Sequence, residues 1–386
     1  MTAPGPPRAA RVLHVAHYSL PHIGGLETVV AAETRRLAAR GWEVALLSSA
    51  WGARAGRSVE DGVRVVRVRA WSGLEPRFGV PFPVFSPWLL VAMFREVRRA
   101  DVVHVHDPLY LTSWVAAFWC LVLRTPYVVH RHVGFVHHSS LVVRLVQRVV
   151  LGSFARIVLR GAAVVVPIDE FIAAGTRRSL GDSVRVEVVG NGVDTELFRP
   201  AAPGEQERLR TELGLPVDQP LALFVGRFVP KKGFAQVAAA ASDDYGTVFA
   251  GGDRPVGVDD ERLHFLGGRP AAEMPAVYRC ADAMVVASVG ECPLTVLEAM
   301  SSGLPVLAND DPALHSPWTS GPGVRFVDIS SGDLRPALED LVADRASMRS
   351  AGAQARAFVE GAFSWDAHVD RLESLYDELR ASPHDR

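Results

Sequence analysis

The chain has 386 residues, 48% of them hydrophobic and 22% charged, which suits two domains of ordinary size with full hydrophobic cores. Its three cysteines include no Cys-x-x-Cys pair, which argues for a reducing compartment and against a structural zinc site. The longest apolar stretch, 115–123, is far shorter than the roughly 20 residues needed to cross a bilayer. Residues 1–11 lack the apolar core of a signal peptide, so we expect a cytoplasmic protein.

The net charge of −2 hides an uneven distribution. Residues 1–190 hold 23 Arg against 13 Asp and Glu, which gives +10, and residues 191–386 hold 18 Arg and Lys against 30 Asp and Glu, which gives −12. A basic first half is compatible with anionic partners at that half. Mutual attraction of two domains across a cleft explains the asymmetry equally well.

Strand and helix signals alternate through the first half. Residues 11–16 predict a buried strand, and Gly24-Gly25 then open a helix predicted over 26–40. Further strands are predicted at 44–47, 101–106, 127–130, 163–166 and 186–189. Short β-branched runs between helices indicate a parallel sheet covered on both faces.

The second half repeats this pattern after a turn and linker at 191–194 and 200–204. Its strands are predicted at 221–225, 245–250, 264–266, 283–287 and 305–307. The last segment, 365–379, carries Val369, Leu372, Leu375 and Tyr376 at helical spacing. We therefore predict α/β domains at 1–195 and 205–364, with 365–386 as a C-terminal helix that packs back on the first domain.

The chain contains only two lysines, Lys231 and Lys232, which follow Gly226 and Arg227 at the end of the strand predicted at 221–225. Codon bias towards arginine explains the imbalance, and it makes the surviving pair informative. Lysine is a compact point charge and arginine a planar fork, so they replace each other poorly at a single phosphate oxygen. We interpret this segment as a phosphate site at the exit of a strand.

Several motifs occur in an order and spacing that together are specific. They are Gly24-Gly25-Leu26-Glu27, His104-Val105-His106-Asp107, Asn191-Gly192-Val193-Asp194 with the run to Pro200, Gly226-Arg227 with Lys232-Gly233, Phe265-Leu266-Gly267, Pro293 to Val306 and Phe363-Ser364-Trp365. With them the chain resembles the nucleotide-sugar-dependent glycosyltransferases of family 4 nearly end to end. The resemblance implies the GT-B fold, in which two Rossmann-like doubly wound domains face a central cleft.

The resemblance also implies roles for charged residues. Arg227 and Lys232 are expected to meet the donor diphosphate, where fixed positive charge stabilises the negative charge that grows on the leaving group. Glu298 is expected to accept hydrogen bonds from the ribose hydroxyls, since a carboxylate suits a vicinal diol.

Backbone groups are expected to contribute to the same donor site. Glycine allows close approach of the chain to a phosphate, and the start of the helix after Pro293 offers N–H groups and a dipole. The remaining donor-binding residues expected are Gly24, Gly25, Gly226, Gly267, Leu294 and Thr295.

One position departs from the family pattern. The first acid of the family's Glu-x7-Glu pair falls on Gly290, and Glu291 comes one residue late. Either the loop is one residue shorter and Glu291 still faces the donor sugar as a catalytic residue, or that role has been lost. We favour the first alternative, because a neighbouring glycine lets the loop re-aim.

Histidines are concentrated in the first half. His104 and His106 share a strand face, as do His130 and His132, but no carboxylate or cysteine cluster accompanies them, and the family needs no metal. We therefore expect no metal and no cofactor. By resemblance His132 lies against the donor sugar and His106 with Asp107 lines the acceptor side, whereas His104 and His130 are expected to be buried with one satisfied nitrogen.

The function expected is that of a retaining glycosyltransferase. It would move a hexosyl unit from a UDP- or GDP-type sugar to an acceptor hydroxyl on a glycan, a lipid-linked sugar or a small natural product. Alternatives are a sugar-nucleotide epimerase or phosphorylase on the same fold, or a non-catalytic partner protein. No nucleic acid is expected, and the basic, apolar segment 141–160 allows peripheral contact with the inner face of a membrane.

Overall fold

The computed structural model describes residues 9–22, 24–73, 82–132, 148–149, 152–290 and 292–381. The chain divides into two compact units. Unit 1 comprises residues 1–190 and 368–386, and unit 2 comprises residues 191–367. The division falls just before the predicted linker, and the end of the chain returns to unit 1.

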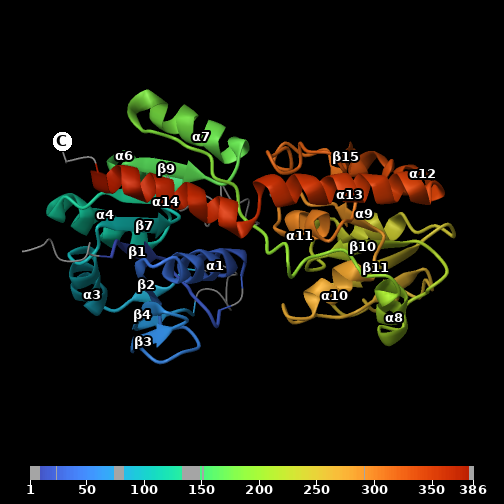
Figure 1. The fold of residues 1–386 in the computed structure, drawn as a ribbon, viewed down its shortest axis with the longest axis horizontal. Coiled ribbons are helices and arrows are strands. Elements are labelled where there is room, and N and C mark those ends of the chain that lie inside the picture. Colours follow the sequence, from blue (N-terminus) through green and yellow to red (C-terminus); the bar gives the residue numbers. More distant parts are fainter. Residues whose placement is uncertain are drawn as a thin grey trace, which may run out of the picture. The chain divides into compact units, whose positions relative to one another are not determined.

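Unit 1 is built on a seven-stranded sheet in the order β3-β4-β2-β1-β7-β8-β9 (Figure 1). Its strands are parallel except for β3, which pairs antiparallel with β4. They are β1 (Arg11–Val15), β2 (Glu43–Ser49), β3 (Gly56–Glu60), β4 (Val63–Val68), β7 (Val102–His106), β8 (Tyr127–Arg131) and β9 (Val164–Pro167). A separate ribbon is formed by β5 (Ala70–Trp71) and β6 (Val84–Phe85).

Helices cover both faces of this sheet. One face packs against α3 (Trp88–Val97), α4 (Leu111–Leu123) and α6 (Phe154–Gly161), and the other against α1 (Gly25–Ala39) and α14 (Trp365–Ala381). The remaining elements are α7 (Glu170–Leu180) and the short η1 (Gly181–Ser183).

Strand alternation assigns each residue of β1 to one face. Leu13 belongs to the core beneath α3 and α4, whereas Val12 belongs to the core beneath α1 and α14. His14 has the same parity as Val12, and the strand register aligns it with His104 on β7. The histidines of β1, β7 and β8 at these positions therefore face α1 and α14.

The four apolar positions expected at helical spacing near the C-terminus lie in α14. All are buried in the same core as the sheet residues of unit 1. They are Val369, Leu372, Leu375 and Tyr376. The last helix thus packs on unit 1 (Figure 1).

Unit 2 is built on a six-stranded parallel sheet in the order β12-β11-β10-β13-β14-β15. Its strands are β10 (Leu221–Val225), β11 (Gly246–Ala250), β12 (Leu263–Phe265), β13 (Ala283–Val286), β14 (Val306–Asn309) and β15 (Val324–Val327). The helices are α8 (Glu205–Glu212), α9 (Phe234–Ala239), α10 (Met274–Arg279), α11 (Thr295–Ser301), α12 (Leu334–Ala343) and α13 (Arg345–Ala362), with the short η2 (Pro230–Lys232) and η3 (Ile329–Ser331). Each face of this sheet has its own apolar core.

The predicted strand at 186–189 is wrong. The segment lies beside β9, where the Glu187 amide donates to Val165 and the Val189 amide donates to Pro167. Only Val186 forms a bridge, so no regular strand results. The hairpin partner β3 was missed because it is exposed and polar, without the β-branched run that marks a buried strand.

Within the described ranges, no helix is both long enough and apolar enough to cross a membrane.

Candidate active site

The strand order of unit 2 reverses beside β10. From β10 the chain continues through β11 and β12 on one side, and then returns to the other side as β13. In doubly wound sheets, ligands bind beyond the carboxyl ends of the strands at such a switch point. A ligand site is therefore expected at the loops after β10 and β13. These loops carry most of the predicted donor-binding residues.

The first of these loops begins with closely packed glycines. Gly226 has φ of +152°, and a Cβ on Gly251 would lie 2.4 Å from the Gly226 carbonyl oxygen. The Gly251 amide in turn donates to the Gly267 carbonyl at 2.9 Å. The predicted residues Gly226 and Gly267 thus meet through Gly251 at the ends of three neighbouring strands.

The two lysines differ in their surroundings. Lys231 is exposed, whereas Lys232 is half-buried. A Cβ at Gly226 would lie 3.6 Å from Lys232 Cδ, so the stem of Lys232 passes over this glycine. Arg227, next to it, is exposed and forms no ion pair with a carboxylate of the described residues.

The lysine turn is joined to the loop after β13. The Val289 amide donates to the Lys231 carbonyl at 3.0 Å. Gly233 ends the turn with φ of +73°, and a Cβ there would lie 2.5 Å from the Ala287 carbonyl oxygen. The two loops that flank the switch point therefore depend on each other for their positions.

Aromatic side chains that were not predicted pack around this turn, where Phe228 contacts Phe249 and Phe265. Phe228 and Phe234 stack with ring centroids 4.3 Å apart, and Phe249 and Phe265 stack at 5.0 Å. Phe249 and Phe265 are register partners on β11 and β12. Aromatic residues near the ends of successive strands were the signal that could have revealed them.

Glu298 lies on α11, after β13. It is half-buried, and its Oε2 accepts a hydrogen bond from the Tyr278 hydroxyl at 2.6 Å. Burial raises the pKa of Glu298, and the Tyr278 hydrogen bond partly opposes that shift. The amides of Leu294 and Thr295 precede Val296, whose amide makes the first backbone hydrogen bond of this turn. Tyr278, on α10, was not anticipated.

Glu291 lies outside the described residues, so its catalytic role stays a prediction. Its neighbour Gly290 has φ of +71°, a conformation that favours glycine, and its amide donates to Asp311 Oδ1 at 3.2 Å.

Unit 1 also has a switch point, between β1 and β7, and predicted residues gather beside it. His106 and Asp107 are buried, at 0% and 1% exposure. His106 Nδ1 lies 3.1 Å from His132 Nε2, and Asp107 Oδ1 accepts the His132 amide at 3.1 Å. Both residues thus hold His132 in position, and their contact with an acceptor stays a prediction.

Gly24 precedes α1, and Gly25 is its first residue. A Cβ on Gly24 would lie 2.3 Å from Glu27 Oε2, so the Glu27 carboxylate folds back against this glycine. Glu27 Oε1 pairs with His22 Nδ1 at 2.8 Å.

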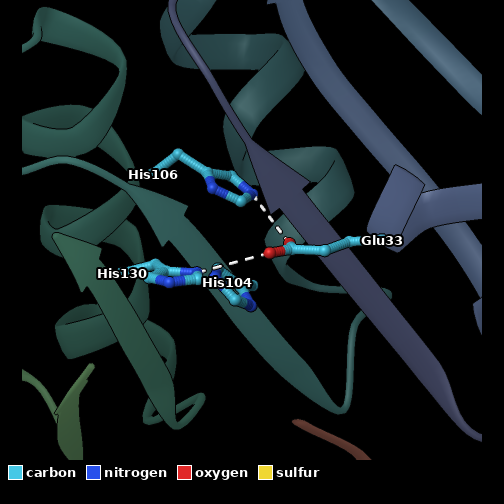
Figure 2. Close-up of side chains that lie close together, drawn as sticks. All are labelled: Glu33, His104, His106 and His130. Carbon is cyan, nitrogen blue, oxygen red and sulfur yellow. Dashed lines mark ion pairs between the residues drawn. The ribbon is translucent and has the colours of Figure 1, made fainter. Parts of the chain in front are cut away.

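The expectation that no carboxylate accompanies the histidines is wrong. Glu33, on α1, is fully buried against His106 and His130 (Figure 2). It lies 71 residues before His104 in the chain, which is why strand spacing did not reveal it. His104 is buried with Nδ1 bonded to the Tyr376 hydroxyl, as expected, whereas the polar contact of His130 is with Glu33 Oε1 at 3.4 Å.

These groups have shifted pKa values. Burial lowers the pKa of His106 and His132 well below the usual range. Burial alone would raise the pKa of Glu33, but the adjacent His130 and His368 side chains and the other nearby imidazoles hold that pKa well below its usual range. The cluster therefore combines an ionised carboxylate with neutral imidazoles.

The segment 141–160 lies in part outside the described residues. Its described end forms α6, which exposes Phe154 and Ile157 while Val158 and Leu159 pack into the core. Membrane contact stays a prediction.

Comparison with known proteins supports the assignment of this fold. Residues 23–197 match the family described as "Glycosyltransferase Family 4", and residues 205–358 match "Glycosyl transferases group 1". The structure is similar to that of HepE from Anabaena, solved in complex with UDP, with a TM-score of 0.73 and 17% identity. That match covers 95% of this chain and all of the HepE chain.

Several curated relatives carry the name D-inositol 3-phosphate glycosyltransferase, and two of them illustrate the similarity. The protein of Corynebacterium glutamicum is 34% identical over 227 residues, 52% of this chain and 53% of that protein. This chain thus spans about half the length of that relative. The protein of Corynebacterium diphtheriae is 27% identical over 410 residues, 94% of this chain and 92% of that protein. With its two matching domains and its two Rossmann-like units, this chain belongs to glycosyltransferase family 4 and has the GT-B fold.

Proposed function

We propose that this protein is a retaining glycosyltransferase. It moves a hexosyl unit from a UDP- or GDP-type sugar to an acceptor hydroxyl, and the transfer step uses no metal ion. Membership of family 4 supports transferase chemistry, whereas the donor, the stereochemical outcome and the acceptor are parts of the proposal.

One observation carries the proposal: the two loops at the switch point of unit 2, which hold the predicted phosphate and ribose groups, are joined to each other. Lys232 and Arg227 come from the loop after β10, and Glu298 comes from the helix after β13. The hydrogen bond between Val289 and Lys231 joins these loops. Cationic groups and an acidic acceptor thus sit on two segments of fixed relative position.

The chemistry follows from these groups. The bond from the anomeric carbon to the diphosphate oxygen breaks, and a bond from that carbon to the acceptor oxygen forms. Lys232 and Arg227 stabilise the negative charge that develops on the leaving diphosphate. That diphosphate takes up the acceptor's proton, so no dedicated side-chain base is required.

Other residues orient the donor. Glu298 Oε1 has no hydrogen-bond partner among the described residues, whereas Oε2 is fixed by Tyr278, so one carboxylate oxygen remains for the ribose hydroxyls. The amides of Leu294 and Thr295 face the phosphates, and His132 lies against the donor sugar.

The names of the similar proteins support the substrates proposed. HepE was solved with UDP, which supports a uridine donor. The two relatives are named for inositol phosphate, which supports a phosphorylated polyol among the acceptors. The +10 charge of residues 1–190 suits such an anionic acceptor.

Lys232→Ala tests this proposal, with Lys231→Ala as its matched control. UDP, GDP and ADP are first titrated into the wild-type protein to find the base that binds. Loss of a charge-assisted contact to phosphate costs about 1.5–3 kcal/mol, so Lys232→Ala should weaken binding of that nucleoside diphosphate by roughly 10-fold or more.

Lys231→Ala keeps the backbone carbonyl that holds Val289 and should bind within about twofold of the wild type. Calorimetry provides the affinities, and the circular dichroism melting curve shows that both variants are folded. Equal affinity in Lys232→Ala and the wild type would remove the phosphate role.

A further inference from the structure

A cluster of buried polar side chains lies in the core of unit 1. Glu33 on α1, His104 and His106 on β7, and His130 on β8 are all 0% exposed. Figure 2 shows the Glu33 carboxylate facing His106 and His130, with His104 beside them. Burying a carboxylate and three imidazoles costs free energy unless the groups are fully paired, so the cluster calls for an explanation.

Several atoms in the cluster lack a hydrogen-bond partner among the described residues. They include Glu33 Oε2, His104 Nε2 and both ring nitrogens of His130. Buried nitrogen and oxygen atoms are almost always paired in folded proteins. Atoms without partners that converge from three elements indicate a ligand that accepts lone pairs from all of them.

The separations of these atoms suit a metal ion. Glu33 Oε2, the carboxylate oxygen without a partner among the described residues, lies 3.6 Å from His106 Nε2. Around a tetrahedral zinc ion with bonds of about 2.0–2.2 Å, ligand atoms are roughly 3.3–3.6 Å apart. One atom from each of the four residues lies within 4.8 Å of all the others, so small side-chain movements close the site.

Contacts on the far side of three of the four residues orient them towards the centre. His104 Nδ1 is held by the Tyr376 hydroxyl, and His106 Nδ1 lies 3.1 Å from His132 Nε2. Glu33 Oε1 lies 2.9 Å from His368 Nε2. Such outer contacts fix the ring orientation and tautomer of metal-bound histidines.

The donor set indicates which ion fits. Three imidazoles and one carboxylate suit zinc and similar transition-metal ions, whereas magnesium and calcium prefer oxygen ligands. Four protein ligands without exposure to solvent leave no position for a substrate, which is typical of a structural site. His14 must give way, because its Nδ1 lies 3.0 Å from His106 Nε2 and the ion replaces that hydrogen bond.

We propose that Glu33, His104, His106 and His130 form a structural site for one zinc-type divalent cation in the core of unit 1. The ion ties α1 to β7 and β8, and it takes no part in sugar transfer. The proposal rests on this cluster alone and is independent of the donor site in unit 2.

The test uses the full-length protein with any histidine tag removed. Plasma mass spectrometry of the purified wild-type protein should find about one zinc ion per chain. Chelator treatment should lower the melting temperature, and added Zn²⁺ should restore it, since an ion that binds only the folded state stabilises it. The cobalt-substituted protein should show the intense visible absorption bands of four-coordinate cobalt.

Glu33→Gln and His130→Gln should each weaken Zn²⁺ binding at least about 10–100-fold. His17→Gln is the matched control, since His17 is also buried in unit 1 but stacks on Tyr110 and is not one of the four proposed ligands. Should the cluster variants fail to fold, the wild-type metal content and cobalt spectrum still decide. The proposal is overturned if the wild-type protein contains no metal and its melting temperature does not change when Zn²⁺ is added after chelation. The cluster would then be purely ion-paired. Stoichiometric zinc that persists in Glu33→Gln would place the ion elsewhere and would also overturn it.

Discussion

Glu298 combines a proposed binding role with a cost to the folded protein. Burial raises its pKa, so the folded protein holds this proton more tightly than the unfolded chain does. The stability that it contributes is fully present below the unfolded pKa, about 4.3, and is lost as the pH rises through the folded pKa. As the pH rises through the folded pKa, ionisation of this carboxyl group therefore destabilises the free protein.

Glu298→Gln should reveal both effects. The amide is neutral and can still accept from the Tyr278 hydroxyl, so the variant should have a higher urea midpoint than the wild type at pH 8. That difference should shrink towards pH 4, where the wild-type carboxyl is protonated. Nucleotide affinity should fall about 10-fold, which corresponds to 1.4 kcal/mol.

The measurements are urea titrations at the two pH values and calorimetry at neutral pH. Glu196→Gln, at an exposed carboxylate of the same unit, is the control and should change neither quantity. A wild-type midpoint above that of Glu298→Gln at pH 8 would contradict the argument from burial.

Single residues were predictable from the sequence where the neighbouring chain defines their environment. The motif around the two lysines assigned the phosphate role to Lys232, which stays a prediction, and Lys232 is the less exposed of the pair. Glu33 was not predictable, because its environment comes from β7 and β8, far along the chain. The contact of Tyr278 with Glu298 was not predictable for the same reason, since only folding places the two residues side by side.

At the scale of elements, the turn between β10 and α9 is the most constrained part of the proposed site. Gly233 needs its left-handed backbone, and its missing Cβ leaves room for the Ala287 carbonyl. Gly257 has a similar φ of +84°, but a Cβ there would meet nothing within 4 Å. Comparing substitutions at the two glycines therefore separates the free-energy cost of the backbone conformation from the free-energy cost of steric crowding.

Gly233→Ala should destabilise the protein by more than Gly257→Ala. Both variants incur about 1–2 kcal/mol for a side chain in the left-handed region. Gly233→Ala must also displace the loop after β13, so its nucleotide affinity should fall while that of Gly257→Ala stays unchanged. Urea unfolding and calorimetry measure the two quantities, and equal losses of affinity in both variants would contradict a role for the loop contact.

The elements themselves were largely predictable. Buried β-branched runs predicted most strands of both sheets, although β4 and β15 were missed, and helical spacing predicted α1 and α14, since those patterns reflect burial directly. The segment at 186–189 has the same composition but forms a single bridge, because pairing at a sheet edge depends on register with β9. Exposed β3 has no apolar pattern to detect.

At the scale of the whole molecule, each unit has its own sheet, its own cores and its own switch point. The predicted donor contacts fall in both units: Lys232, Arg227 and Glu298 belong to unit 2, whereas His132 and the Gly24-Gly25 turn belong to unit 1. Because that turn is expected to approach a phosphate, a nucleoside diphosphate should affect it together with the loops of unit 2, whereas His132 should respond only to the complete donor.

Hydrogen exchange of the full-length protein with mass spectrometry tests this division. The nucleoside diphosphate that binds should slow exchange at 226–233 and 293–298, because phosphate and ribose contacts order both loops of unit 2. Protection by the nucleoside diphosphate should also reach residues 24–28, and the sugar-bearing donor should extend it to the peptide that contains His132. Both ligands are added at concentrations that give the same fractional saturation of the protein. This removes differences in occupancy, since stabilisation by a ligand depends on its concentration relative to its dissociation constant. Absence of protection at 24–28 would remove the Gly24-Gly25 turn from the phosphate contacts, and absence of protection at 226–233 would remove the lysine turn from the donor site.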